Sequence, residues 1–330
     1  MVKVDATMAR PMCLDPVRRV VTSEAIMAAA NRISRLRAHG ALFAALGLTG
    51  CLSVAPLSQP AQDFVGAANA LAQAESDYFD EIQAASDAGH QLRGAADYTA
   101  RNGTFADIAT ELARRDDFSK AKQIRLAALK QLQNYAAAIS QIQNGGSATW
   151  VADDSKAAMA DINALAGDAG LSPVNAKAAG IAQAVVNQLG TAIINNQSAK
   201  KIQELAVEAK VPIAGIASMI TEDEQNIEGD KFASGLLADQ TADLNNVLHA
   251  IYDDPRAGAA DRFQAVQAVV NWRKAVVTKG RTIQAAMAKL EAANDALSKK
   301  QSVDAVALAQ QAAALAQQAL GISPKTGAKG

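Results

Sequence analysis

The chain has 330 residues, of which half are hydrophobic, 32 are basic and 33 are acidic. That length can bury the core of one large domain or of two small ones. Because charges of both signs are interspersed, the sequence lacks the basic patch that nucleic-acid binding requires, and we expect no nucleic-acid partner. Helix-forming residues dominate and no stretch shows strand-like alternation, so we expect an all-α fold.

The stretch from Arg32 to Cys51 has the three parts of a secretory signal. Three arginines form its basic start, residues 40–48 carry no charge, and the small residues Thr49 and Gly50 precede the cysteine. The apolar run is about half of the ~20 residues that span a bilayer core. The pattern therefore predicts an export signal and not a transmembrane helix.

The end of this stretch, Leu48-Thr49-Gly50-Cys51, resembles the lipobox of bacterial lipoproteins. The resemblance implies cleavage between Gly50 and Cys51 and attachment of diacylglycerol to the sulfur of Cys51, followed by acylation of the new amino terminus. Leu52 stands where an aspartate commonly favours retention in the inner membrane. The resemblance therefore implies sorting to the outer membrane, on its periplasmic side.

The signal also bears on the residues before and after it. We expect Met27 to be the true start, so that residues 1–26 are a dispensable leader and residues 27–50 the signal peptide. Arg18-Arg19 lacks the apolar run of a twin-arginine signal at the usual distance. Cys51 is then the only mature cysteine, which excludes an internal disulfide, cysteine-ligated zinc and a cysteine nucleophile.

The mature chain is mildly acidic. Residues 1–50 hold seven of the basic and three of the acidic side chains, which leaves a formal net charge of about −5 from Cys51 onward. Such a chain offers no polybasic patch for anionic lipid. We therefore expect membrane attachment to depend on the acyl chains alone.

Residues 51–59 are predicted to form a tether, and the first long helix is predicted over 60–101. Its apolar side chains recur every seven residues, as in a coiled-coil seam; they are Phe64, Leu71, Tyr78, Ala85 and Leu92, with Ala68, Ile82 and Gly89 between them. Asn102-Gly103 can supply the left-handed cap that ends this helix.

A second helix is predicted over 104–143, with a weak point at Asp116-Asp117. Its seam consists of Ala128, Leu132, Tyr135, Ile139 and Ile142. Gly145-Gly146-Ser147 is predicted to close the hairpin. Residues 125–139 resemble a segment of uncharacterised helical lipoproteins of proteobacteria, a resemblance that implies no activity.

Residues 154–168 are predicted to form a shorter helix. Ser172-Pro173 is a typical helix start, and the helix it opens is predicted to reach Met219 with a kink or break near 208–210, before Pro212. Its inner face carries Ile181, Val185, Leu189, Ile193, Ile202 and Leu205.

Thr221–Glu224 is a capping box that predicts a new helix over 221–252. Asp254-Pro255 is predicted to begin the next, whose seam is Val269, Val276, Ile283, Leu290 and Leu297, with Ala286 and Ala293 between them. A last helix is predicted over 302–320, and a loose tail over 321–330. The expected body, 60–320, is an elongated antiparallel helical bundle with coiled-coil-like seams and a possible subdivision near 145–172.

Few residues of the mature chain resemble a catalytic or metal site. The histidines His90 and His249 stand outside any metal-binding motif, so we interpret them as ordinary helix residues. The carboxylates of Asp253-Asp254 and Glu222–Glu224 are explained by helix starts. Trp150 is predicted to lie in a loop and pack over the bundle end, with exposure as a binding anchor as the alternative. Trp272 is predicted to lie in the core.

We therefore expect no enzyme activity, no cofactor and no bound metal. The sequence predicts a lipid-anchored helical protein of the cell envelope that acts as a protein-binding or structural module. Its expected partners are the membrane, through the acyl chains on Cys51, and an unknown envelope protein, with self-association open. The alternative is a periplasmic carrier with a cavity near Pro212 for a small apolar or cell-wall-derived ligand.

Overall fold

A computed structural model describes residues 59–101, 118–146, 149–168, 171, 173–196, 202–228 and 258–321. Every regular element in these residues is an α-helix, as expected. The helices are α2 (Gln59–Arg101), α4 (Phe118–Gln143), α5 (Thr149–Ala166), α6 (Pro173–Asn195), α7 (Ile202–Glu228), α9 (Ala259–Ser298) and α10 (Ser302–Ala319). The predicted signal peptide, Cys51, His249, Asp253-Asp254 and the predicted tail after Gly321 lie outside the described residues.

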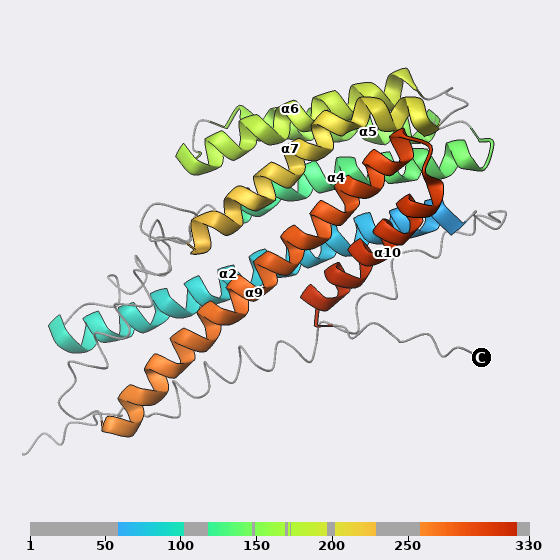
Figure 1. Cartoon of the computed structure of the whole chain (residues 1–330). Helices are drawn as coiled ribbons and strands as arrows, with labels where there is room; N and C mark the ends of the chain where they lie inside the picture. Colours follow the sequence, from blue (N-terminus) through green and yellow to red (C-terminus); the bar gives the residue numbers. More distant parts are fainter. Residues whose placement is uncertain are drawn as a thin grey trace, which may run out of the picture.

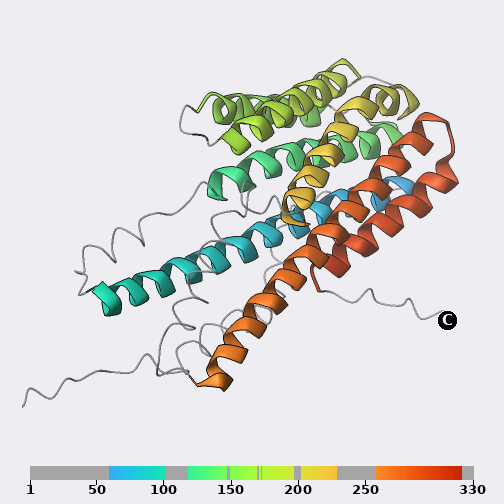
Figure 2. The same ribbon diagram turned by 60° about the vertical axis from the view of Figure 1, so that its left-hand side comes forward.

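The helices form an elongated bundle in which α4 to α7 lie together beside α2, α9 and α10 (Figure 1). Neighbouring helices are mostly antiparallel, as predicted. Lys279 of α9 pairs with Glu81 of α2 at 2.9 Å, and Lys122 of α4 pairs with Asp80 of α2 at 2.6 Å. Two packed pairs run parallel: α10 starts at the same end as α2 (Figure 2), and α4 runs in the same direction as α6, with Lys120 beside Asp168 at their starts.

The predicted seams form one continuous core. Phe64, Leu71 and Tyr78 of α2 are buried with Leu132 and Tyr135 of α4, and each fully buried side chain of this size stabilises the fold by about 1.5–3 kcal/mol. The seam of α9 is also confirmed where its side chains are described; its buried members are Val276, Ile283, Ala286, Leu290 and Ala293. Alanine and glycine in these seams let helices approach closely. A Cβ added to Gly215 of α7 would lie 2.5 Å from Cγ2 of Val185 in α6.

The single helix predicted over 173–219 is wrong, because the structure has two helices there. α6 ends at Asn195, where the neighbouring Asn196 donates from Nδ2 to the carbonyl of Ala192 at 2.9 Å and to Glu208 at 3.0 Å. Asparagine side chains that bond backbone carbonyls favour helix ends. The break therefore falls at the asparagines and not at the proline.

Pro212 lies inside α7, which continues through it to Glu228. A proline removes one backbone donor, but α7 packs against both α6 and α9, and that burial outweighs one hydrogen bond. The predicted break at 208–210 and the capping box at 221–224 are both wrong for the same reason. Thr221 is an interior helix residue whose Oγ1 accepts a hydrogen bond from Nε2 of Gln284 at 3.1 Å.

The starts of two other helices differ from the predicted starts, whereas several other helix boundaries agree closely with prediction. α5 begins at Thr149 and not at 154, and α9 begins at Ala259, after the non-helical Gly258. The start of α2 and the end of α10 agree with prediction within one residue. The end of α4 at Gln143 and the start of α6 at Pro173 are confirmed.

A buried polar bridge joins three helices within the core. The hydroxyl of Tyr135 (α4) donates to Oδ1 of Asn294 (α9), and Nδ2 of Asn294 donates to the carbonyl of Ala206 (α7) at 3.1 Å. Burial raises the pKa of Tyr135 far above its usual range. The ring also packs edge-to-face on Phe64, with centroids 5.8 Å apart.

We predict that Tyr135→Phe lowers the free energy of unfolding by about 1–3 kcal/mol at pH 7, because Oδ1 of Asn294 loses its buried donor. Because the pKa of Tyr135 is raised in the folded protein, its contribution to the free energy of unfolding is fully present below the pKa of tyrosine in the unfolded chain, ~10. That contribution is lost as the pH rises above this value. Urea unfolding at pH 7 and pH 11 should therefore show a smaller alkaline loss in the variant. An unchanged alkaline loss would contradict this assignment.

Candidate functional site

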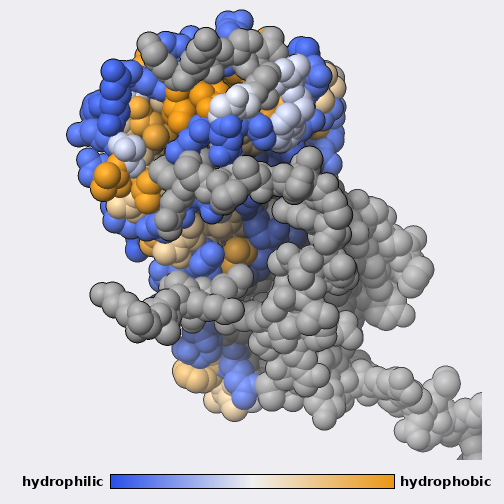
Figure 3. Space-filling model, turned by 90° about the vertical axis from the view of Figure 1, so that its right-hand side faces the viewer, coloured by the Kyte–Doolittle hydropathy of each residue, from blue (hydrophilic) through white to orange (hydrophobic). Residues whose placement is uncertain are grey.

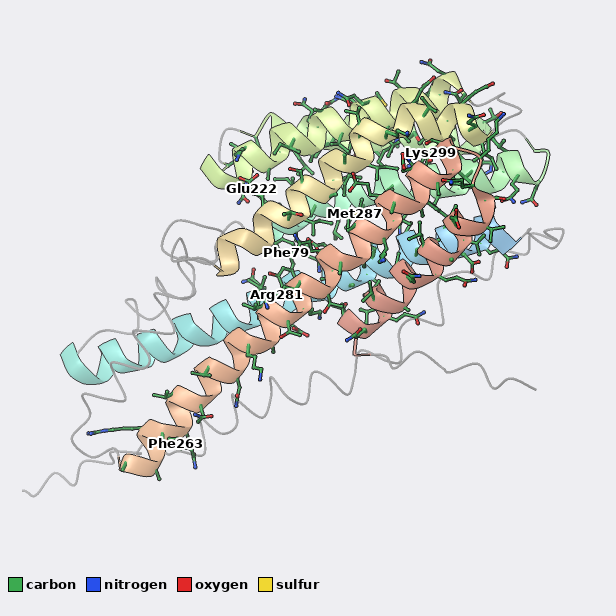
Figure 4. All side chains as sticks on the ribbon, viewed as in Figure 1. Phe79, Glu222, Phe263, Arg281, Met287 and Lys299 are labelled. Atoms are coloured by element: carbon green, nitrogen blue, oxygen red, sulfur yellow. The ribbon has the colours of Figure 1, made fainter. Side chains whose placement is uncertain are left out.

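Helix termini meet at the end of the bundle where α2 begins, which we call the tether end. α5, α7 and α10 also begin there, and α4, α6 and α9 end there (Figure 1). Lys299 lies at this end of α9, and Phe263 lies at the opposite end of the same helix (Figure 4). The tether end carries the candidate site.

A partly open cavity of about 300 Å³ lies at the tether end. Its lining is mainly apolar and comes from α4, α7, α9 and the start of α10; the residues are Ile139, Gln143, Ile202, Gln203, Leu297, Lys300 and Ser302. Gln203 is fixed in place because its Nε2 donates to the carbonyl of Ser298 at 3.0 Å. Oε1 of Gln143 is buried and accepts no hydrogen bond from any residue that the structure describes. The volume is at the lower limit of small-molecule sites.

Lys300 adopts a left-handed backbone conformation at the edge of this cavity, with φ of 64°. It occupies the position after the end of α9 that glycine usually takes. The turn is closed by two backbone hydrogen bonds, from Lys300 to Leu297 at 3.1 Å and from Gln301 to Ala296 at 2.9 Å. Gly145, with φ of 70°, ends α4 with the same pattern of bonds.

The neighbouring charges are held by ion pairs. Lys299 and Lys210 both bond the carboxylate of Asp295, and together they hold its pKa below the usual value. The Lys210 pair joins α7 to α9 at 2.9 Å. Lys300, by contrast, has no ion pair with a residue that the structure describes. Its ammonium is therefore available at the rim of the cavity.

Two large apolar side chains are exposed in the first turns of helices that begin at the tether end. Trp150, in α5, is 51% exposed, and Val303, in α10, is 80% exposed. The loop predicted for Trp150 is wrong, because the residue is helical, and its exposure agrees better with the alternative than with packing over the bundle end. The reason is that α5 starts five residues earlier than its sequence pattern indicated.

The other predicted site residues are scattered. Gly50 and Cys51 lie outside the described residues, so cleavage and lipidation stay predictions. His90 lies in α2 and Trp272 in α9, although their side chains are outside the described part. Glu222 pairs with Lys177 of α6 (Figure 4). The described residues include no group of three metal-ligating side chains, and none of their helices is long and apolar enough to cross a membrane.

Sequence reasoning missed the cavity because its lining comes from four segments that are far apart in the chain. One signal was present. Lys299-Lys300 stands between two predicted helices, at a junction where glycine usually adopts the left-handed conformation. Because no glycine is present there, another residue has to adopt that conformation. The apolar lining of the cavity can hold an apolar group, and Lys300 at its rim can hold a polar or anionic group. The described lining residues include no paired nucleophile and base.

Comparison with protein-family models, with curated proteins and with solved structures finds no match to this chain. We therefore infer function from its own residues.

We predict that Lys300→Gly raises the free energy of unfolding by about 1 kcal/mol, because glycine adopts a positive φ without steric cost. Gly145→Ala is the matched control, because it should change the free energy of unfolding in the opposite direction. A Cβ at residue 145 meets no atom within 4 Å, so its expected loss of about 1 kcal/mol comes from the backbone alone. Thermal unfolding of the two variants checks both, and a destabilised Lys300→Gly would contradict the prediction.

Proposed function

We propose that this chain is a lipid-anchored helical protein of the bacterial cell envelope that acts as a protein-binding or structural module. Acyl chains on Cys51 hold it at the outer membrane, on the periplasmic side. The lipobox-like sequence supports the anchor. The shape of the bundle supports the module, because it gives the protein one end near the tether and another end far from it.

The observation that carries the proposal is the length of α2 and α9. They have 43 and 40 residues, about 60 Å or more at 1.5 Å per residue. Both continue beyond the other helices on the side opposite the tether end (Figures 1 and 2). We call this part, residues 84–101 and 259–275, the distal arm.

The distal arm of α9 presents apolar side chains to solvent. Phe263 is 65% exposed and Val270 is 51% exposed. Seven residues separate them, so they lie on the same face of the helix. Aromatic side chains, phenylalanine among them, are enriched at protein interfaces relative to the rest of the surface. This face is where we expect an envelope partner to bind.

The anchor is tested by labelling cells with a radioactive fatty acid. We expect the wild-type protein to take up label and to fractionate with the outer membrane. Cys51→Ser should take up none, because the hydroxyl cannot replace the thiolate as the acylated nucleophile. A wild-type protein without label would remove the lipid anchor from the proposal.

The partner-binding face is tested by a photo-crosslinking amino acid at position 263. We expect a discrete crosslinked product in intact cells, and its loss when Val270→Glu places a charge on the same face. The crosslinker at Lys130, an exposed residue of α4, is the control. Equal products from positions 263 and 130, or none from 263, would count against the distal arm as a binding face.

A carrier of small apolar ligands is the second candidate, and the cavity at the tether end favours it. That cavity is formed around Ile202 and Leu297 and not around Pro212, where the sequence suggested one. A carrier would retain a bound apolar molecule through purification, which native mass spectrometry detects. A module that binds only proteins would not.

A further inference from the structure

The tether end is the part of the folded body that the chain itself brings closest to Cys51. Residues 52–58 separate Cys51 from Gln59, the first residue of α2. Even when fully extended, this segment spans about 28 Å, whereas α2 is about 65 Å long. The distal arm can therefore reach the same bilayer only if the whole bundle lies flat on it.

The tether end is also where apolar side chains project from first turns. Trp150 and Val303 are both more than half exposed, and a cavity at the same end of the bundle is lined by Ile139, Ile202 and Leu297. Figure 3 views the molecule from this side and shows apolar patches among the hydrophilic surface. Single exposed apolar residues are common; Trp150 and Val303 are the two that lie in first turns at the end that the tether joins, whereas Phe263 and Val270 lie on the distal arm.

The chemistry of this end suits a lipid surface. Tryptophan favours the membrane interface because its ring is apolar and its indole N–H is polar. Lysine can extend its ammonium to lipid phosphates while its methylenes remain on apolar surface. Lys300, at the rim of the cavity, is placed to do so. A surface for a protein partner would not need to lie close to the acylated cysteine, as the tether end does.

The charges at this end determine which lipids it suits. Exposed carboxylates stand near the apolar residues; they are Asp153, Asp154, Glu204 and Asp304. Asp153 is paired with Lys156 at 2.8 Å. These carboxylates offset Lys300, so electrostatic attraction to anionic lipid is small. Apolar insertion into a zwitterionic headgroup layer is the remaining source of affinity.

We propose that the tether end docks on the phospholipid surface, with Trp150 and Val303 inserted at headgroup depth, so that the distal arm projects away from the membrane. This inference rests on the lipid anchor of the proposed function. The acyl chains hold the protein at the bilayer, and the docked end orients it. The orientation leaves Phe263 and Val270 free for a partner.

The test uses the full lipidated protein with one added cysteine. Because Cys51 is acylated, a cysteine introduced by Val303→Cys is the only free thiol of the mature chain and takes an environment-sensitive fluorophore. Phe263→Cys is the matched control, since that residue is also exposed but lies on the distal arm. Each labelled protein is reconstituted into phosphatidylethanolamine and phosphatidylcholine vesicles, with and without brominated lipid.

We expect the probe at 303 to shift to the blue and to be quenched by brominated lipid, and the probe at 263 to do neither. Equal quenching at both positions would mean that the bundle lies flat, and would overturn the proposal. So would a probe at 303 that is shielded from iodide but not quenched by lipid, because a second copy or another protein would then cover this end.

Flotation of the vesicles distinguishes a failure of the docking proposal from a failure of the lipid anchor. A protein that floats with the vesicles while the probe at 303 stays in water overturns docking and leaves the anchor intact. A protein that does not float overturns the anchor and the docking together.

Discussion

The hydrogen bonds made by Asn294 set the register of the bundle. Its side chain accepts from Tyr135 of α4 and donates to the backbone of Ala206 in α7. All of these groups are buried, so a slip of either neighbouring helix by one residue would leave polar atoms without partners. Apolar seams tolerate such slips far better, because alanine and leucine contacts lack direction. The polar bridge therefore supplies the specificity that the alanine-rich core lacks.

That register has a direct consequence at the tether end. With Ala206 beside Asn294, the start of α7 lies beside the end of α9, and Gln203 bonds the carbonyl of Ser298. The same alignment brings Ile202 and Leu297 to the wall of one cavity. It also places Lys210 beside Asp295. The cavity, the ion pairs and the left-handed turn at Lys300 thus depend on one buried contact that lies within two helical turns of each of them.

Much of the helical layout follows from local sequence. Where their side chains are described, the seams of α2, α4 and α9 lie in the core as their seven-residue spacing predicts, since a helix has one face toward the core; Ala85, Gly89, Leu92 and Val269 lie outside the described side chains. The errors occur where tertiary packing competes with a local signal. Pro212 and the capping box at 221–224 are typical helix boundaries, yet both lie inside α7 because two neighbouring helices bury it. Trp150 was misplaced because the early start of α5 has no strong capping signal.

The sequence alone determined the all-α class, the seams and the candidate anchor at Cys51, because each depends on residues close together in the chain. Only the tertiary structure decided which helix termini meet. The seven helices of the described residues can pair in many orders, and seams of alanine and leucine do not distinguish between partners. The cavity, the exposed first turns of α5 and α10, and the distal arm all arise from that pairing, so no local pattern could have placed them.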